Sequence, residues 1–515
     1  MTDGDGALTR AGIEQRLLSN SGLILAARVV TACLSFATVP VLVSRFGVAG
    51  YGTWEALLAL ATLNSLFQAG ISGTIVWRVS EAYSRGDGDE VRRVARLGAG
   101  ATWALFMLLW PIAWFLRQPV VEFLRVSPEI QRLAAEMFPV VAALVLLTGL
   151  CETLEAVVSG CQRTGLVNVI GAGAQILNYS MVIVLTLLGA GLWSLVIGQA
   201  LGFVARLAGA WVAARLVFGP VSLLPLLPRS GDMAMASYSG LLMVSSVAAA
   251  LRDQTDKVIL SSLASPGWVG YYGIASRLAG LVMEILRPLY SPLLTAAGAL
   301  NAIGDWEGVR RLYGRSMAIV SVLTGLVVVV VAGLADYLVI AWIGYPIPEV
   351  TLLVWLLIAG GATAAILTGA GTAICRGCGR AGIETTYLGF NLVLNLVLTI
   401  LLVLWIGPIG TAVATGVTWA VSSVLFLVVL HKRVELPADA SRRAGGVALL
   451  AAVVAFSVYW ISTVLPVPDS RPDALLSTAV LGTIGALSYL GLVFLLRLAS
   501  IRDAYAGLRS LRGPA

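Results

Sequence analysis

Charged side chains stand inside apolar stretches of this chain, and the densest group of them has the sequence RDQTDK at residues 252–257. Helical spacing would pair Arg252 with Asp256 and Asp253 with Lys257, because side chains four residues apart share a face. Such pairs neutralise themselves and can snorkel to a nearby membrane surface. The same groups could instead bind a transported cation or close a gate. Asp253, Asp256 and Lys257 are therefore candidates for ion coupling or gating.

A line of charges follows on the next apolar stretch. Arg277, Glu284 and Arg287 have a spacing that places them on one helix face. Arg28 lies in the first apolar stretch, without an acid four residues away. A charge at the bilayer centre costs about 2.5–3.5 kcal/mol on insertion scales, so such side chains face water or the protein interior. The pattern predicts a hydrated, cationic cavity for an anionic group such as a phosphate, with interhelical salt bridges as the alternative. The candidate substrate contacts are Arg28, Arg252, Arg277, Glu284 and Arg287.

Further acids lie in apolar stretches of the first half. Glu55 is in the second stretch and is a candidate for ion coupling or gating. Glu152 and Glu155 lie toward the end of the fourth stretch. They could form a proton or cation site, although an ion pair with nearby Arg163 is the simpler expectation.

The sequence gives little support for a metal site, a nucleotide site or enzymatic activity. Cys375 and Cys378 have CxxC spacing, but no second pair or neighbouring histidine completes a zinc site. The single histidine, His431, lies at the end of an apolar stretch. A P-loop needs Gly-Lys-Ser/Thr, whereas the two lysines, Lys257 and Lys432, follow Asp and His. We expect a protein that is not an enzyme and has no metal or cofactor, driven by an ion gradient, the membrane potential or the substrate gradient.

The composition requires lipid as the solvent of this chain. Hydrophobic residues make up 58% of the 515 positions and charged residues 12%, whereas soluble domains carry about 25% charged residues. Crossing the hydrocarbon takes about 20 apolar residues in a helix. The sequence predicts an all-α polytopic membrane protein with about fourteen such helices, at residues 22–43, 54–77, 98–116, 137–159, 167–188, 192–217, 235–263, 269–297, 317–343, 350–374, 385–406, 410–430, 446–465 and 475–496.

The basic residues between these stretches predict the orientation. Loops on one side hold 23 of the arginines and lysines, and loops on the other side hold five, namely Arg45, Arg117, Arg125, Arg132 and Arg471. Basic loops stay in the cytoplasm, so both termini are expected to be cytoplasmic. The excess of bases, 34 against 27 acids, is explained by this bias and does not indicate nucleic-acid binding.

Short motifs recur at a fixed offset, which indicates a tandem duplication. The sequence GDGDEVRR at 86–93 returns as GDWEGVRR at 304–311, and GCQRTG at 160–165 returns as GCGRAG at 377–382, offsets of 218 and 217 residues. With six helices per copy, the copies have the same orientation and are related by a pseudo-two-fold axis along the membrane normal. We expect an N-lobe at 1–218, a C-lobe at 230–432, two extra helices at 444–497 and a cytoplasmic tail at 498–515.

These motifs, in this order, resemble the multidrug/oligosaccharidyl-lipid/polysaccharide exporter superfamily, and most closely its O-antigen and polysaccharide flippase branch. The resemblance spans roughly residues 20 to 435. The matching residues are Pro40, SRFG at 44–47, GYG at 50–52, GCQRTGLVN at 160–168, DKVIL at 256–260, VGYY at 269–272, Arg277, Pro292 and the repeated GD…RR motif.

The resemblance implies two six-helix lobes around a cavity lined by helices one, two, seven and eight. It implies flipping of an undecaprenyl-diphosphate-linked oligosaccharide from the cytoplasmic to the periplasmic leaflet of the bacterial inner membrane by alternating access, for O-antigen, capsule or exopolysaccharide synthesis. Arginines in the cavity would then meet the diphosphate, which a guanidinium contacts bidentately. Membrane lipids and polysaccharide polymerase machinery are the implied partners.

Three other functions stay open. A lipid II flippase would share the cationic cavity, and a drug/cation antiporter of the same superfamily would have a more acidic or apolar one. A membrane glycosyltransferase or polymerase would need a larger outer loop with catalytic groups than the one at 117–136.

Overall fold

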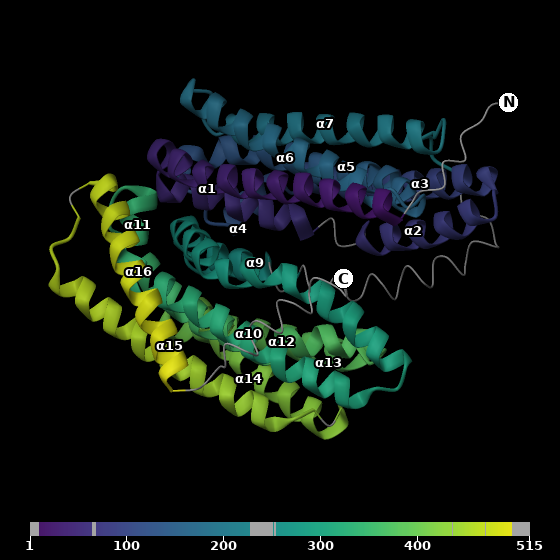
Figure 1. Ribbon diagram of the computed structural model, residues 1–515. Coiled ribbons are helices and arrows are strands. Elements are labelled where there is room, and N and C mark those ends of the chain that lie inside the picture. Colours follow the sequence, from purple (N-terminus) through teal and green to yellow (C-terminus); the bar gives the residue numbers. More distant parts are fainter. Residues whose placement is uncertain are drawn as a thin grey trace. The chain divides into compact units, whose positions relative to one another are not determined.

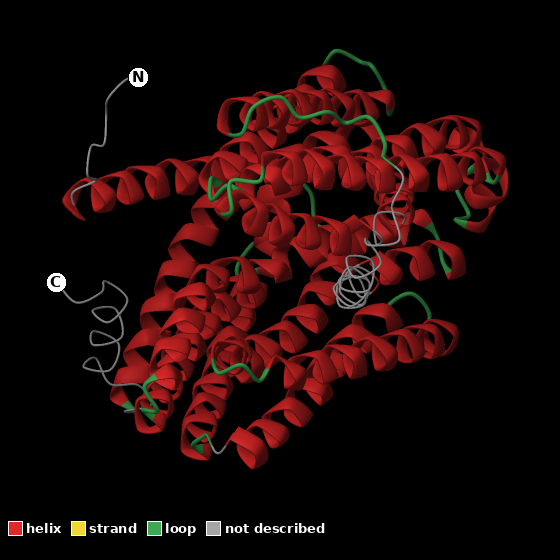
Figure 2. Cartoon of the chain, turned by 90° about the vertical axis from the view of Figure 1, so that its right-hand side faces the viewer, coloured by secondary structure: helices red, strands yellow, loops and turns green. Residues whose placement is uncertain are grey.

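The computed structural model describes residues 10–63, 68–226, 251, 254–434, 436–468 and 470–496. The described residues form helices joined by short connections and contain no strand (Figure 2). Twelve of these helices are long and apolar enough to cross a membrane. The predicted all-α polytopic membrane fold is therefore confirmed. The predicted stretch 235–263 lies largely outside the described residues, and the count of fourteen spans stays a prediction.

The chain divides into two compact units, Met1–Ala250 and Leu251–Ala515. Unit 1 contains α1 (Arg10–Leu63), α2 (Gln68–Ser84), α3 (Gly88–Phe115), α4 (Arg117–Phe123), α5 (Pro128–Gly160), α6 (Thr164–Leu187) and α7 (Trp193–Val217). Within it, α5 packs against α2, α3 and α7 (Figure 1). Ile75, Val79, Leu154 and Val157 form part of a fully buried apolar cluster there. This cluster is the core expected of a helix that is apolar on all faces.

The first two predicted spans, 22–43 and 54–77, are separated by a break inside α1. Gly47 has φ 68° and ψ 171°, outside the helical region. Only glycine adopts this conformation at low cost, because it has no Cβ. The helix resumes beyond this residue, and the second predicted span continues into α2. Gly47 therefore supplies the turn that the sequence placed between the first two spans.

Unit 2 contains the helical residues 254–263 and eight further helices. These are α9 (Pro266–Ala302), α10 (Trp306–Gly333), α11 (Ala335–Ile343), α12 (Pro348–Gly377), α13 (Ala381–Ile406), α14 (Gly410–Val434), α15 (Ala438–Val464) and α16 (Arg471–Leu495). Among the helices that the structure describes, α9 and α12 make the most extensive contact. A Cβ at Gly377 would overlap the α9 backbone at Leu294 and the side chain of Ala297. Glycine at this position allows the two helices to approach closely.

The predicted ninth span, 317–343, is wrong in its boundaries. The structure divides this stretch at Leu334, whose φ of −125° ends α10, and the nine-residue α11 follows. A Cβ at Gly333 would lie 3.1 Å from the carbonyl oxygen of Ala455 in α15. The long helix is therefore α10, which begins eleven residues earlier than predicted, at Trp306. Apolar composition alone does not reveal where such a helix is interrupted.

The two extra C-terminal helices pack within unit 2, against α10. Helices α15 and α16 contact α10 through a cluster that includes Val329, Val454, Ala455 and Tyr489. Tyr489 is fully buried, and its hydroxyl donates to the Val322 carbonyl oxygen at 3.3 Å. These helices therefore extend the apolar core of the second repeat.

The repeated GD motif forms the same turn in both units. Gly86 and Gly304 both have φ 74°. The next residue caps a helix in each case, with Asp87 accepting from the Glu90 amide at 3.0 Å and Asp305 accepting from the Gly308 amide at 2.7 Å. Such caps satisfy amides that have no partner within the helix. The sequence repeat is thus a repeat of local structure.

Candidate functional site

A buried carboxylate in unit 2 gathers hydroxyl groups from three other helices. Asp256 accepts from Tyr272 at 2.9 Å and from Thr415 at 2.8 Å through Oδ2, and from Thr399 at 3.1 Å through Oδ1. These partners come from α9, α14 and α13. Asn395 adds a second layer by donating to Thr415 Oγ1 at 3.3 Å. Asp256, one of the predicted ion-coupling residues, is thus surrounded by oxygen groups inside the helix bundle.

The Thr415 hydroxyl has two acceptors for one proton. Its Oγ1 lies 2.8 Å from Asp256 Oδ2 and 3.0 Å from the Thr411 carbonyl oxygen. A hydroxyl has one proton to donate and two lone pairs to accept with. It can therefore donate to an ionised Asp256, or donate to Thr411 and accept from a protonated Asp256. The cluster can therefore hold Asp256 in its ionised or its protonated form without a change in backbone conformation.

The oxygen cluster has no counterpart at the equivalent positions of unit 1. The offset of 217 residues maps Thr399 onto Val182 and Thr415 onto Gly198. In unit 1, Gly198 packs directly against α6, where a Cβ would lie 3.1 Å from the carbonyl oxygen of Asn178. The two threonines that hold Asp256 are therefore specific to the second repeat. Sequence reasoning missed them, although hydroxyl residues inside the stretches 385–406 and 410–430 were visible.

The other predicted residues of the segment 252–257 are Arg252, Asp253 and Lys257, and the structure describes only the last of them. Arg252 and Asp253 lie outside the described residues, so the predicted pairs of Arg252 with Asp256 and of Asp253 with Lys257 are not described. Lys257 is half-buried.

The predicted charged face lies on α9, and it is more exposed at residues 284 and 287 than at residue 277. Arg277 is half-buried, while the side chains of Glu284 and Arg287 are 61% and 67% exposed. Arg287 pairs with Glu284 at 3.0 Å. Pro288, one position further, lacks the amide that would bond the Glu284 carbonyl, which weakens the helix there. The charges at 284 and 287 thus lie at a weak point of a candidate span.

In unit 1, Arg28 and Glu55 have different environments. Arg28 is exposed on α1. Glu55 is buried and accepts from the Tyr51 hydroxyl at 2.8 Å. Both residues belong to unit 1, whereas the Asp256 cluster belongs to unit 2.

The two acids of α5 have partners other than the expected Arg163. Glu155 forms a bidentate pair with Arg206 of α7, with both N–O distances 2.7 Å. Glu152 accepts from Ser72 of α2 at 2.8 Å. Arg163 is exposed at the start of α6. Arg206 is therefore engaged in binding α7 to α5.

The cysteines of the CxxC motif are both buried. Cys375 and Cys378 are free thiols at the end of α12. Burial raises the pKa of the Cys378 thiol above its ordinary value, with a smaller opposing effect of Arg380. A protonated thiol is a poor nucleophile and a poor metal ligand. His431 lies 3.2 Å from the Ser441 hydroxyl, a contact between α14 and α15.

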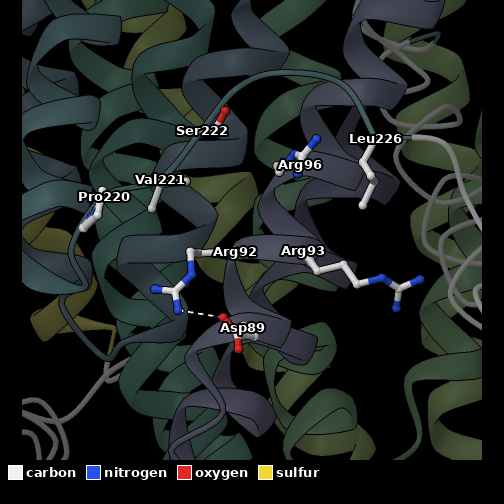
Figure 3. Close-up of a pocket in the computed structure, with 8 residues that line it drawn as sticks. All are labelled: Asp89, Arg92, Arg93, Arg96, Pro220, Val221, Ser222 and Leu226. Atoms are coloured by element: carbon white, nitrogen blue, oxygen red, sulfur yellow. Dashed lines mark hydrogen bonds and ion pairs between the residues drawn. The ribbon is translucent and has the colours of Figure 1, made fainter.

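A second charged feature lies at the start of α3. Arg92, Arg93 and Arg96 line a groove of about 500 Å³ together with the segment 220–226, which follows α7 (Figure 3). The sequence analysis used these arginines for loop orientation and, for Arg92 and Arg93, for the repeated motif, and it did not predict a binding site there.

Comparisons with known proteins match the chain to one family and to proteins of similar sequence or fold. Residues 41–345 match the model of a family described as polysaccharide biosynthesis protein. A stretch of 120 residues is 28% identical to a probable multidrug resistance protein NorM of Rhizobium meliloti (strain 1021). The aligned stretch covers 23% of this chain and 26% of that protein. The fold is similar to that of the lipid II flippase MurJ in an inward closed conformation, with TM-score 0.72, 13% identity and coverage of 93% of this chain and 100% of that chain. It is also similar to an inward-facing multidrug resistance MATE family transporter, with TM-score 0.65, 14% identity and coverage of 78% and 94%.

Proposed function

Because the chain belongs to the polysaccharide biosynthesis protein family of the multidrug/oligosaccharidyl-lipid/polysaccharide exporter superfamily, we propose that it flips a lipid-linked oligosaccharide for polysaccharide synthesis. The cargo of this proposal is an undecaprenyl-diphosphate-linked glycan, moved from the cytoplasmic to the periplasmic leaflet of a bacterial inner membrane by alternating access. Polysaccharide polymerase machinery would use the flipped product.

The charged face of α9 is the observation that supports this substrate class. Arg277 and Arg287 lie within a candidate membrane span, and Arg287 keeps a largely exposed side chain. An ionised guanidinium is not stable against hydrocarbon, so a water-filled path must adjoin this face. Glu284 pairs with Arg287, and the guanidinium groups of Arg277 and Arg287 are the candidate contacts for a diphosphate. Arg28 on α1 stays a candidate from the sequence alone.

The Asp256 cluster is the proposed coupling site. A buried carboxylate is costly unless it is neutralised or fully hydrogen-bonded. The alternative proton positions of Thr415 support binding and release of a proton or a monovalent cation. The energy for flipping would then come from an ion gradient.

Complementation of strains that each lack one defined flippase tests the substrate. Rescue of polysaccharide export in a strain without its lipid-linked oligosaccharide flippase is the expected result. Rescue only of a strain without a lipid II flippase, or only of drug resistance in a strain without its antiporter, would contradict the proposal. Asp439→Asn, an exposed carboxylate at the start of α15, serves as the control variant for expression and insertion.

A further inference from the structure

The groove in unit 1 is built from two elements far apart in the sequence. Arg92, Arg93 and Arg96 project from the first turns of α3, and the segment 220–226 passes across them (Figure 3). Asp89 also lines the groove and accepts from Arg92 at 2.7 Å. Three guanidinium groups therefore share the lining with one carboxylate.

The segment is held on α3 by two hydrogen bonds, one between main-chain groups and one from a side chain. The Leu226 amide donates to the Arg96 carbonyl oxygen at 3.3 Å. Arg96 Nε in turn donates to the Leu224 carbonyl oxygen at 3.4 Å. A Cβ at Gly100 would lie 2.8 Å from the Leu226 carbonyl oxygen, so glycine there permits the close approach. The groove is thus a built feature and not a gap between loosely placed chains.

The arrangement of charge favours an anion. Arg92 and Arg96 are four residues apart, so they lie on one face of α3, and like charges at this spacing destabilise a helix. Arg93 points to the other side of the helix in Figure 3 and pairs with Glu90 at 3.6 Å. The segment 220–226 contains no charged residue. A phosphate between Arg92 and Arg96 would relieve their repulsion with charge-assisted hydrogen bonds.

The position of the groove along α3 favours a lipid over a soluble anion. Arg96 is the last charged residue of α3, since residues 97–116 carry no charge. The groove therefore lies where the apolar part of the span begins, at the level of lipid headgroups. Val221 and Leu226 line it, and Leu224 beside them is 69% exposed. Guanidinium groups next to the exposed side chain of Leu224 match the two parts of a phospholipid.

We propose that this groove binds the phosphate of an anionic phospholipid, through Arg92 and Arg96, with the glycerol and first methylenes against Val221 and Leu226. The ligand would hold the segment 220–226 on α3.

The second repeat provides a matched comparison. The offset of 218 places Arg310 and Arg311 at the positions of Arg92 and Arg93, but Gly314 at the position of Arg96. Neighbouring Tyr313 is fully buried and lies 3.3 Å from the Ser441 hydroxyl of α15. α15 thus packs against this part of unit 2, and the groove is a property of unit 1.

The test measures lipid binding to the purified full-length protein in detergent. Phosphatidylglycerol, phosphatidylcholine and inorganic phosphate are titrated separately, with the thermal unfolding midpoint and native mass spectrometry as readouts. We expect saturable binding of phosphatidylglycerol that weakens about tenfold or more in Arg96→Gln, since a charged hydrogen bond is lost. Arg96→Lys should bind with intermediate affinity. Arg310→Gln removes the same charge in the second repeat and should change the affinity by about twofold or less.

A second variant keeps the test decisive if Arg96→Gln does not fold. Ser222→Trp fills the groove from its exposed side and retains both arginines, so it should exclude the lipid by volume. Phosphatidylglycerol binding at wild-type affinity in both variants, or in the one that folds, would overturn the proposal. Equal binding of phosphatidylcholine, or the same stabilisation by inorganic phosphate, would overturn the assignment to an anionic lipid.

Discussion

The Tyr272 hydroxyl donates a 2.9 Å hydrogen bond to Oδ2 of Asp256, and this bond ties α9 to the helical residues 254–263 inside unit 2. The charged face of α9 and the buried carboxylate are therefore linked through one helix. A change in the charge of Asp256 alters a bond on the same helix that presents Arg277. This link gives a physical route from ion binding to the proposed substrate contacts.

Asp256→Asn should remove the dependence of transport on an ion gradient. The amide of asparagine has nearly the shape of the carboxylate, but it does not ionise, and it binds a cation more weakly. We expect folded protein at wild-type level and export that no longer responds to an imposed proton or sodium gradient. Flux into proteoliposomes with each gradient in turn provides the measurement. The control Asp439→Asn should keep the gradient dependence of the wild type. If Asp256→Asn keeps it as well, Asp256 is not the coupling site.

The candidate substrate contacts are tested by glutamine and lysine variants. If the cargo carries a diphosphate, at least one of Arg28, Arg277 and Arg287 is required. Its replacement by Gln should weaken binding by about tenfold or more, because a charge-assisted contact is worth about 1.5–3 kcal/mol. Lys should rescue only partly, because it lacks the guanidinium fork. Glycan export is measured per unit of folded protein, and normal export in all three Gln variants would contradict an anionic cargo at these positions.

The pair of Glu155 and Arg206 should behave as a structural contact. Either Glu155→Gln or Arg206→Gln leaves one charge without its partner, which should cost about 1.5–3 kcal/mol of stability. The double variant should recover part of the loss, because no unpaired charge remains. The exposed pair of Arg132 and Glu136 is the control, where Arg132→Gln should cost less than about 1 kcal/mol. Unfolding of the purified protein is the readout, and a double variant less stable than both singles would contradict this role.

The turn after α5 offers a substitution that should stabilise the protein. Gln162 has φ 62°, and its repeat equivalent, Gly379, has φ 71°. A side chain in this region costs about 1 kcal/mol relative to glycine. Gln162→Gly should therefore raise the unfolding midpoint, while Gly379→Gln should lower it. Shifts of the same sign would show that the two turns are not equivalent.

The topology is tested with reporter fusions. The loop charges predict a cytoplasmic reporter at Arg85, Arg229 and Ala438, and a periplasmic reporter at Glu129 and Asp469. Arg229 and Asp469 lie outside the described residues, so these two positions rest on the sequence alone. One clear reversal among the five would contradict the count of fourteen spans.

The sequence by itself determined the membrane fold and its internal duplication. Apolar stretches longer than the hydrocarbon thickness must be helices, because their backbone groups find no partners in lipid. The turn at Gly86 and the cap at Asp87 are equally local, since neighbouring residues satisfy them, and they recur at Gly304 and Asp305. Such features can be predicted from residue type and spacing.

Only the tertiary structure decided which buried polar groups meet. Glu155 pairs with Arg206, 51 residues away, and not with Arg163 nearby. Thr415 reaches Asp256 across 159 residues of sequence. These partners depend on how closely the helices approach and how they are rotated, which small residues such as Gly198 and Gly377 control through backbone contact. A helical pattern specifies which face is polar, and packing specifies what that face contacts.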